Sequence, residues 1–174
     1  MNAVVKGLAA IALALLAIPA FAQSTKPNDA QIAAIVVAAN QVDIDAGKLA
    51  VKHAYDPEVK AFAERMITDH TAVNKQATAL VKKLNVTPEE NELSKSLKAD
   101  GAKTLDKLRE LKDGQFDRAY IDNEVKYHQA VLEVIDKTLL PNAQNAELKE
   151  LITKVRPAIE AHLKHAEQLQ ASLK

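Results

Sequence analysis

The chain has 174 residues, with 23 Lys and Arg against 23 Asp and Glu, and it contains no Cys. The balanced charge argues against a strong electrostatic grip on nucleic acid or anionic lipid, and the lack of Cys excludes disulfides and thiolate metal sites. Few glycines and aromatic residues among many Ala, Leu, Lys and Glu residues favour helix throughout, so we expect one all-α domain stabilised by packing.

The first residues have the pattern of an export signal. Lys6 supplies a positive charge, residues 8–20 are apolar but too few to span a bilayer, and Ala20-Phe21-Ala22 has small residues where signal peptidase reads them. The mature protein would then be periplasmic or secreted, with no later segment apolar enough to cross a membrane; an uncleaved membrane anchor is the alternative. The predicted parts are a signal peptide over residues 1–22, a linker over 23–28 and a helical domain over 29–174.

Start and stop signals divide the rest of the chain into five predicted helices. Asp29 is expected to cap the first, Asp56-Pro57 to start the second and Thr87-Pro88-Glu89-Glu90 to start the third. Asp113-Gly114 should end the third helix and Pro141 the fourth. The predicted helices cover about residues 29–53, 57–84, 88–112, 115–140 and 143–173.

Four of these helices, all except the third, carry apolar residues at alternating steps of three and four. This spacing is the seam of a left-handed bundle, and four seams imply four helices around one core. Short turns make the first and second helices antiparallel, and likewise the fourth and fifth, whereas residues 85–114 separate the two pairs. We therefore predict a ferritin-like four-helix bundle with an additional helix in the long crossover between helices two and four. A plain up-down bundle with a short helix at one end is the alternative.

Four of the five histidines lie on these seams: His53, His70, His128 and His162. His53 ends its helix and should lie at the rim, whereas the other three interrupt apolar rows near the middle of the bundle. A buried imidazole without a partner would cost about 1–3 kcal/mol, so each should have a hydrogen-bond partner or a metal ion.

The heights of these histidines can be compared if the crossover returns the chain to its starting end. His70 and His128 would then share one layer, with ring nitrogens within about 10 Å. His162 should lie opposite Glu124, which is four residues before His128 and on the same face. Asp43 or Asp69 would contribute at the edge. The candidate metal ligands are His70, His128, His162, Glu124, Asp43 and Asp69.

Imidazole and carboxylate ligands in a bundle core suit a single Fe, Mn, Zn or Cu ion. Di-iron bundles place Glu-x-x-His on each of two helices, and this sequence has no such motif, so oxygen-activating di-iron chemistry is not expected. Structural histidines bonded to carboxylates are the alternative to a metal site. Neither a catalytic nucleophile nor a Gly-rich phosphate loop is evident, which favours a protein that is not an enzyme.

Several motifs follow one another in a fixed order along the chain. They are Phe62 and Met66 before Asp69-His70-Thr71, Phe116-Asp117-x-x-Tyr120 before His128, and Pro157 before His162. In these motifs the chain resembles the exported bacterial family called domain of unknown function 4142, assigned to the ferritin-like superfamily. The resemblance extends from Asp29 to Leu169 and implies a periplasmic or outer-membrane-associated ferritin-like bundle. It implies no activity, because the family has none established.

Three functions remain open from the sequence. The first is an exported bundle that takes part in metal handling or envelope stress through its histidine cluster. The second is a metal-dependent enzyme of ferritin-like descent. The third is an interaction module whose crossover helix binds an envelope protein or a second copy of the chain.

Overall fold

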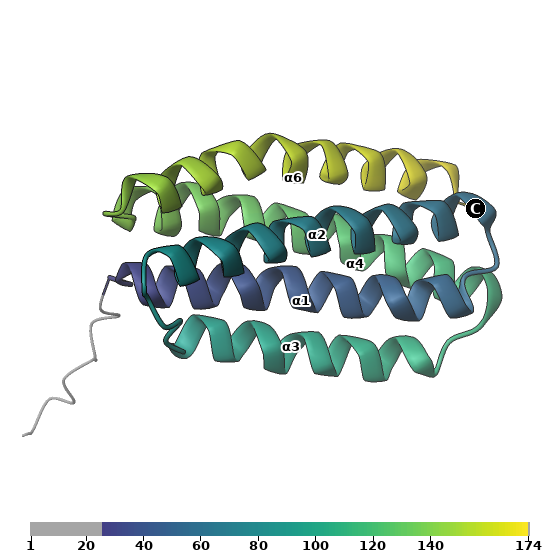
Figure 1. Ribbon diagram of the computed structural model, residues 1–174. Helices are drawn as coiled ribbons and strands as arrows, with labels where there is room; N and C mark the ends of the chain where they lie inside the picture. The colour runs from purple at the N-terminus through teal and green to yellow at the C-terminus, as the bar shows by residue number, and fades with distance from the viewer. Residues whose placement is uncertain (1–25, 174) are drawn as a thin grey trace, which may run out of the picture.

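The computed structural model describes residues 26–173, and the predicted signal peptide over residues 1–22 lies outside them. Every regular element within this range is helical, and five long helices lie side by side (Figure 1). The predicted all-α class is confirmed. The long helices are α1 (Asp29–His53), α2 (Pro57–Lys83), α3 (Glu92–Arg109), α4 (Asp113–Val134) and α6 (Ala146–Ser172); η1 (Ile135–Leu139) and α5 (Leu140–Asn142) are short.

The chain reverses direction at each connection between long helices (Figure 1). α1 and α2 form one antiparallel pair and α4 and α6 another, while α3 runs along the outer side of α1 for the length of the bundle. Because α3 carries the chain back, α2 and α4 begin at the same end and run in the same direction. A Cβ at Gly101 of α3 would lie 2.8 Å from Cγ1 of Val42, so the glycine permits this close approach to α1.

Four predicted helix starts differ from the structure in their capping residue or position. Asp113-Gly114, expected to end the third helix, instead forms the first turn of α4, which begins at Asp113 rather than at about Gln115, whereas α3 already ends at Arg109. Asn28 rather than Asp29 caps α1, because its side chain accepts from Gln31 N–H at 2.8 Å. Asp29 instead accepts hydrogen bonds from the backbone N–H groups of Gln144 and Asn145, both at 2.9 Å, and so ties the start of α1 to the turn before α6. The last helix accordingly begins at Ala146 rather than Ala143.

The third helix begins at Glu92, later than the predicted start at Thr87-Pro88. Asn91 and Ser94 form a reciprocal capping box there, in which each side chain accepts from the backbone N–H of the other residue at the start of the helix. Pro141 does not end the fourth helix at once. The chain first widens into the π-helical turn η1, and Pro141 then fits the first turn of α5, where a missing N–H costs little.

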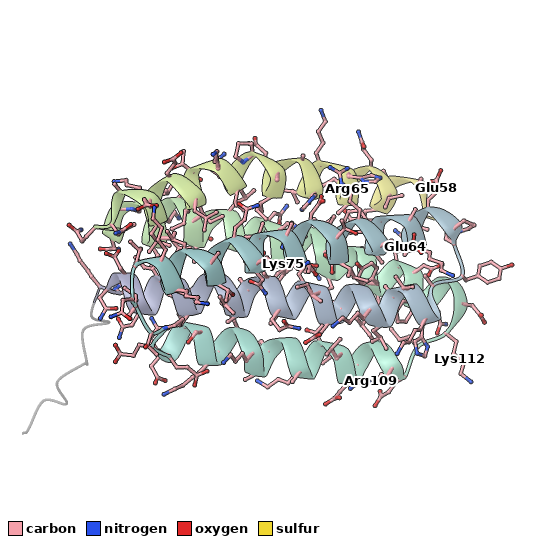
Figure 2. All side chains as sticks on the ribbon, viewed as in Figure 1. Glu58, Glu64, Arg65, Lys75, Arg109 and Lys112 are labelled. Atoms are coloured by element: carbon pink, nitrogen blue, oxygen red, sulfur yellow. The ribbon has the colours of Figure 1, made fainter. Side chains whose placement is uncertain are left out.

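Charged side chains point away from the bundle, as the labelled Glu58, Glu64, Lys75 and Arg109 show in Figure 2. The apolar core consists of two clusters, one at each end of the molecule. Along each of α1, α2, α4 and α6, buried polar residues separate the two clusters, so a polar layer crosses the middle of the core. This layer contains Asn40, Asp43, His70, Glu124, His128 and His162.

Among the helices of residues 26–173, none combines the length and apolar character that a membrane crossing requires.

Candidate metal centre

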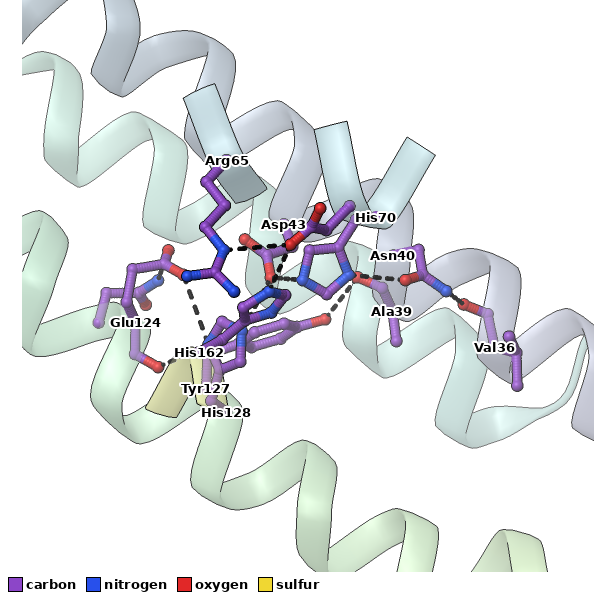
Figure 3. A network of polar contacts seen from close by, with 12 residues as sticks. Val36, Ala39, Asn40, Asp43, Arg65, His70, Glu124, Tyr127, His128 and His162 are labelled. Atoms are coloured by element: carbon purple, nitrogen blue, oxygen red, sulfur yellow. Dashed lines mark hydrogen bonds and ion pairs between the residues drawn. The ribbon is translucent and has the colours of Figure 1, made fainter. Parts of the chain in front are cut away.

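Three imidazole rings meet in the middle of the bundle: His70 from α2, His128 from α4 and His162 from α6 (Figure 3). Their ring centroids are 5.8 Å apart for His70 and His128, 5.3 Å for His70 and His162, and 5.5 Å for His128 and His162. One ring nitrogen from each lies within 4.8 Å of the other two. The prediction that His70 and His128 share one layer is confirmed, because α3 returns the chain to the end where α2 begins.

His128 is oriented by its own helix. Its Nδ1 lies 2.9 Å from the backbone carbonyl oxygen of Glu124, one turn earlier on α4. A carbonyl oxygen can only accept, so Nδ1 carries the proton and donates it. Nε2 is therefore the nitrogen with a free lone pair, and it faces the other two rings.

His70 is oriented by an amide on α1. Its Nδ1 lies 2.6 Å from Oδ1 of Asn40, whose Nδ2 donates to the Val36 carbonyl at 2.7 Å (Figure 3). The Val36 carbonyl fixes which end of the amide is the donor, so Oδ1 must accept from His70. Nδ1 of His70 thus carries a proton, and Nε2 is directed into the cluster.

His162 is oriented by a carboxylate on α2. Its Nε2 donates to Oδ2 of Asp69 at 2.8 Å, and the same oxygen lies 3.3 Å from Nε of Arg65. Asp69 is half-exposed and Arg65 is exposed, so this support lies at the surface while the ring is buried. The remaining nitrogen of His162, Nδ1, is left facing inward.

The three inward nitrogens share the features of metal ligands. Nε2 of His70, Nε2 of His128 and Nδ1 of His162 are buried and have no hydrogen-bond partner among the described residues. Burial lowers the pKa of His128 below its ordinary value and that of His162 to about 4. Both rings are therefore neutral at pH 7, with the lone pair that a metal ion needs. In metalloproteins the second nitrogen of a ligating histidine is normally held by an outer partner, as all three are here.

The carboxylate of Asp43 on α1 lies against two of the three rings. Its Oδ2 is 2.8 Å from Nε2 of His70 and 3.4 Å from Nε2 of His128, and neither contact has the angles of a hydrogen bond. Burial acts to raise the pKa of Asp43, but the two rings outweigh it and the pKa is lowered. A carboxylate this close to a ring nitrogen requires a positive charge, supplied by a proton on the ring or by a metal ion.

Glu124 forms a second group of donors with Asp43 and His128, again with ligand atoms within 4.8 Å of one another. The Glu124 side chain is fully buried. Burial and the adjacent Asp43 carboxylate raise the pKa of Glu124 well above its ordinary value. The pair therefore consists of one ionised carboxylate, Asp43, and one neutral carboxyl group, Glu124.

The structure brings five of the six candidate ligands to one place. They form two adjoining groups that share His128, one with His70 and His162 and the other with Asp43 and Glu124. Asp43 joins the two groups, because its carboxylate lies close to both His70 and His128. Asp69 stands behind His162, where it supports the ring and does not face the others.

Of the partners that orient the rings, the sequence pointed only to Asp69, and as a ligand rather than as a support. Asn40 was also detectable, because it is a polar residue three positions before Asp43 on the inner face of α1. Tyr127 also lies beside the cluster: its hydroxyl donates to the Ala39 carbonyl at 2.8 Å, and its ring lies edge-on to His128. Nothing in the sequence pointed to Arg65, because it contacts Asp69 rather than a histidine.

These observations define a class of protein: an all-α bundle of five long helices that buries three imidazoles and two carboxylates at one level. The chain belongs to the family described as Domain of unknown function (DUF4142), which matches residues 15–169. The resemblance seen in the sequence is thereby confirmed.

A solved structure of CopM in the Cu(II)-bound form is similar to this chain, with a TM-score of 0.65. The similarity covers 85% of this chain and 100% of the CopM chain at 20% sequence identity, so it shows a shared fold. No curated protein matches the chain in sequence.

Proposed function

We propose that this protein is an exported bundle that binds one divalent transition-metal ion, copper(II) foremost. The observation that carries the proposal is the convergence of three buried imidazoles, each bonded outward and each with an unpartnered nitrogen directed inward. His70, His128 and His162 would be the nitrogen ligands, and Asp43 the oxygen ligand. The similarity in fold to CopM, which has been solved with Cu(II), supports the choice of metal.

The donor types favour some ions over others. Imidazole nitrogens suit Cu, Zn, Ni and Fe, and at a given nitrogen and oxygen site Cu(II) binds most tightly among the divalent first-row ions. Asp43 supplies the negative charge that offsets part of the charge of the ion in this buried place. Glu124 is neutral without metal and becomes available as a further oxygen ligand if it loses its proton.

Asn40, Asp69 and the Glu124 carbonyl would act as supports rather than ligands. Each accepts from the outer nitrogen of one ring and so fixes both its tautomer and its direction. Such outer partners also make the ligand nitrogen more basic, which strengthens its bond to a metal ion.

The fold supports a ferritin-like origin. Two antiparallel pairs, α1–α2 and α4–α6, are joined by a segment that runs the length of the bundle, as in ferritin-like proteins. The signal pattern in residues 1–22 supports export, and in the periplasm such a bundle would serve metal handling or envelope stress. Mass analysis of the chain recovered from the periplasm tests the export step, because cleavage after Ala22 leaves Gln23 as the first residue.

Metal analysis of untagged protein tests the binding function. We expect one Cu(II) or Zn(II) per chain after loading and dialysis, and loss of that ion in His70→Ala and in His128→Ala. His53→Ala is the matched control, because His53 is exposed and stacks on Phe116 outside the cluster. A protein that retains no ion, and whose melting temperature does not respond to added Cu(II) or Zn(II), would show that the histidines are structural.

Electron paramagnetic resonance of the Cu(II)-loaded protein identifies the ligands. We expect hyperfine structure from three imidazole nitrogens in the wild-type protein and from two in His162→Ala. A spectrum that His162→Ala leaves unchanged would remove His162 from the ligand set.

A further inference from the structure

A cavity of about 440 Å³ adjoins the polar layer on one side. Small-molecule sites have volumes of roughly 300–1,000 Å³, so this one is large enough for an organic ligand. Its wall is mostly apolar and comes from α1, α3, α4, η1 and α6, with a smaller contribution from α2. Typical wall residues are Ile35, Val36, Leu97, Val131, Ile135 and Leu139.

The cavity opens between α3 and α4. Its exposed lining residues all belong to these two helices, including Ser96 and Asp100 on α3 and Lys126 on α4. The two helices touch each other far less than α3 touches α1, which leaves this gap between them. The π-helical turn η1 contributes Ile135 and Leu139 to the wall, and such turns are frequent at functional sites.

The inner end of the cavity is polar. Asp43, His70 and His128 line it, whereas His162 does not. Within residues 26–173, both oxygens of Asp43 and Nε2 of each of these two rings have no hydrogen-bond partner, although all three side chains are at most 4% exposed. The apolar cavity therefore ends at buried polar atoms that could bind a ligand.

We propose that this cavity binds a small organic acid, whose apolar body lies along α1 and α4 and whose carboxylate reaches the ion held by His70 and His128. The inference rests on the proposed metal function. An apolar wall with one polar end is the usual form of a site for an amphiphilic small molecule.

The acid group follows from the charges at the inner end. Without an ion, this end offers the Asp43 carboxylate, which repels an acid. With an ion, three neutral imidazoles and Asp43 leave a divalent cation with a net positive charge in a buried place, and an anionic ligand would neutralise it. Four protein donors also leave Cu(II) a free coordination position, and the cavity provides access from the side of Asp43, His70 and His128.

Titration of the protein with octanoate tests the proposal. Binding is monitored by calorimetry and by the visible spectrum of Cu(II). The Cu(II) content of the same sample is measured first. In the loaded protein we expect one octanoate per chain, a shifted copper absorption, and an affinity at least a hundredfold above that for acetate. In the metal-free protein the affinity for octanoate should fall at least tenfold.

Val131→Phe tests the location, because a larger side chain at this half-buried wall position fills the cavity. We expect at least a tenfold loss of octanoate affinity with one Cu(II) per chain retained. Val81→Phe is the matched control, since Val81 is a half-buried valine on α2 outside the cavity, and octanoate affinity should stay unchanged.

Three outcomes would overturn the inference. If the protein holds no Cu(II), the proposed function fails and the acid site fails with it. If Cu(II) binds but octanoate binds no better than acetate, or Val131→Phe has no effect, the metal function stands and the cavity has no such role. If octylamine binds the metal-free protein more tightly than octanoate binds the loaded one, the site is made for a cationic head group.

Discussion

Nδ1 of His70 lies 2.6 Å from Oδ1 of Asn40, and this contact joins α2 to α1 inside the polar layer. The amide cannot turn around, because its nitrogen is bonded to the Val36 carbonyl. The contact therefore decides that Nε2, rather than Nδ1, of His70 faces Asp43. A residue outside the ligand set thus sets the geometry of a ligand.

Asn40→Ala should weaken both folding and metal binding. The variant leaves Nδ1 of His70 buried without an acceptor, which should lower the free energy of unfolding by about 1–3 kcal/mol. Loss of an outer partner of this kind should reduce Cu(II) affinity by about 10–100-fold. Urea unfolding of the metal-free protein and a competition titration with a copper chelator measure the two effects. Asn74→Ala, which removes an amide at the same α1–α2 interface outside the cluster, should leave Cu(II) affinity unchanged.

Asp69→Ala should affect binding more than folding. The Asp69 side chain is 40% exposed, so its removal costs little stability, yet it holds the outer nitrogen of His162. We expect Cu(II) affinity to fall about 10–100-fold. Asp45→Ala is the control, because Asp45 is 41% exposed and also pairs with a basic residue on its own helix. Equal affinities of the two variants would mean that Asp69 does not support the site.

Glu124→Gln should change how stability depends on pH. The pKa of Glu124 is raised by burial and by Asp43, so the folded protein keeps this proton above pH 4.5 while the unfolded chain loses it. The wild type therefore loses stability as pH rises from about 4.5 towards the folded pKa, by up to about 1.4 kcal/mol per pH unit. Glutamine cannot ionise, so the free energy of unfolding of the variant should increase relative to that of the wild type as pH rises.

Urea unfolding of the metal-free proteins from pH 5 to pH 8 measures this difference. Glu133→Gln is the control, because Glu133 is exposed on the same helix and its pKa is lowered by Lys137 rather than raised. Parallel stability curves for Glu124→Gln and the wild type would mean that Glu124 is ionised in the folded protein.

Asp117→Ala should destabilise the fold while leaving the metal site intact. The buried Asp117 carboxylate accepts from the backbone N–H groups of Tyr55 at 3.0 Å and Asp56 at 2.7 Å, and so holds the α1–α2 turn against α4. Loss of both bonds should lower the free energy of unfolding by about 2–4 kcal/mol. The folded variant should still bind one Cu(II). Asp122→Ala, which removes a bond to the Gln170 side chain, should cost less than about 1 kcal/mol.

This role of Asp117 explains one of the motifs that link the chain to its family. In the sequence, Phe116-Asp117-x-x-Tyr120 is one of the motifs that carry the family resemblance. In the structure, Phe116 and Tyr120 pack in the apolar cluster near the α1–α2 turn, and Asp117 bonds that turn. The motif is structural because it joins two distant parts of the chain, and only the fold shows which parts they are.

The sequence by itself determined the helices and their inner faces. Apolar spacing is a local property, and it placed His70, His128 and His162 on the inward side, with the first two at one height. It put His162 opposite Glu124, whereas in the structure the ring centroid of His162 lies 5.5 Å from that of His128. Helix ends were less certain, because start signals at Asp29 and Thr87 competed with the stronger capping boxes of Asn28 and Asn91.

Only the tertiary structure decided which polar groups contact one another. Asp69 and His70 are neighbours in the chain, but successive residues point about 100° apart around a helix. His70 therefore meets Asp43 on α1, while Asp69 meets His162 on α6. Such pairings depend on how each helix is rotated against its neighbours, and that rotation is set by the packing of the whole core rather than by any one stretch of sequence.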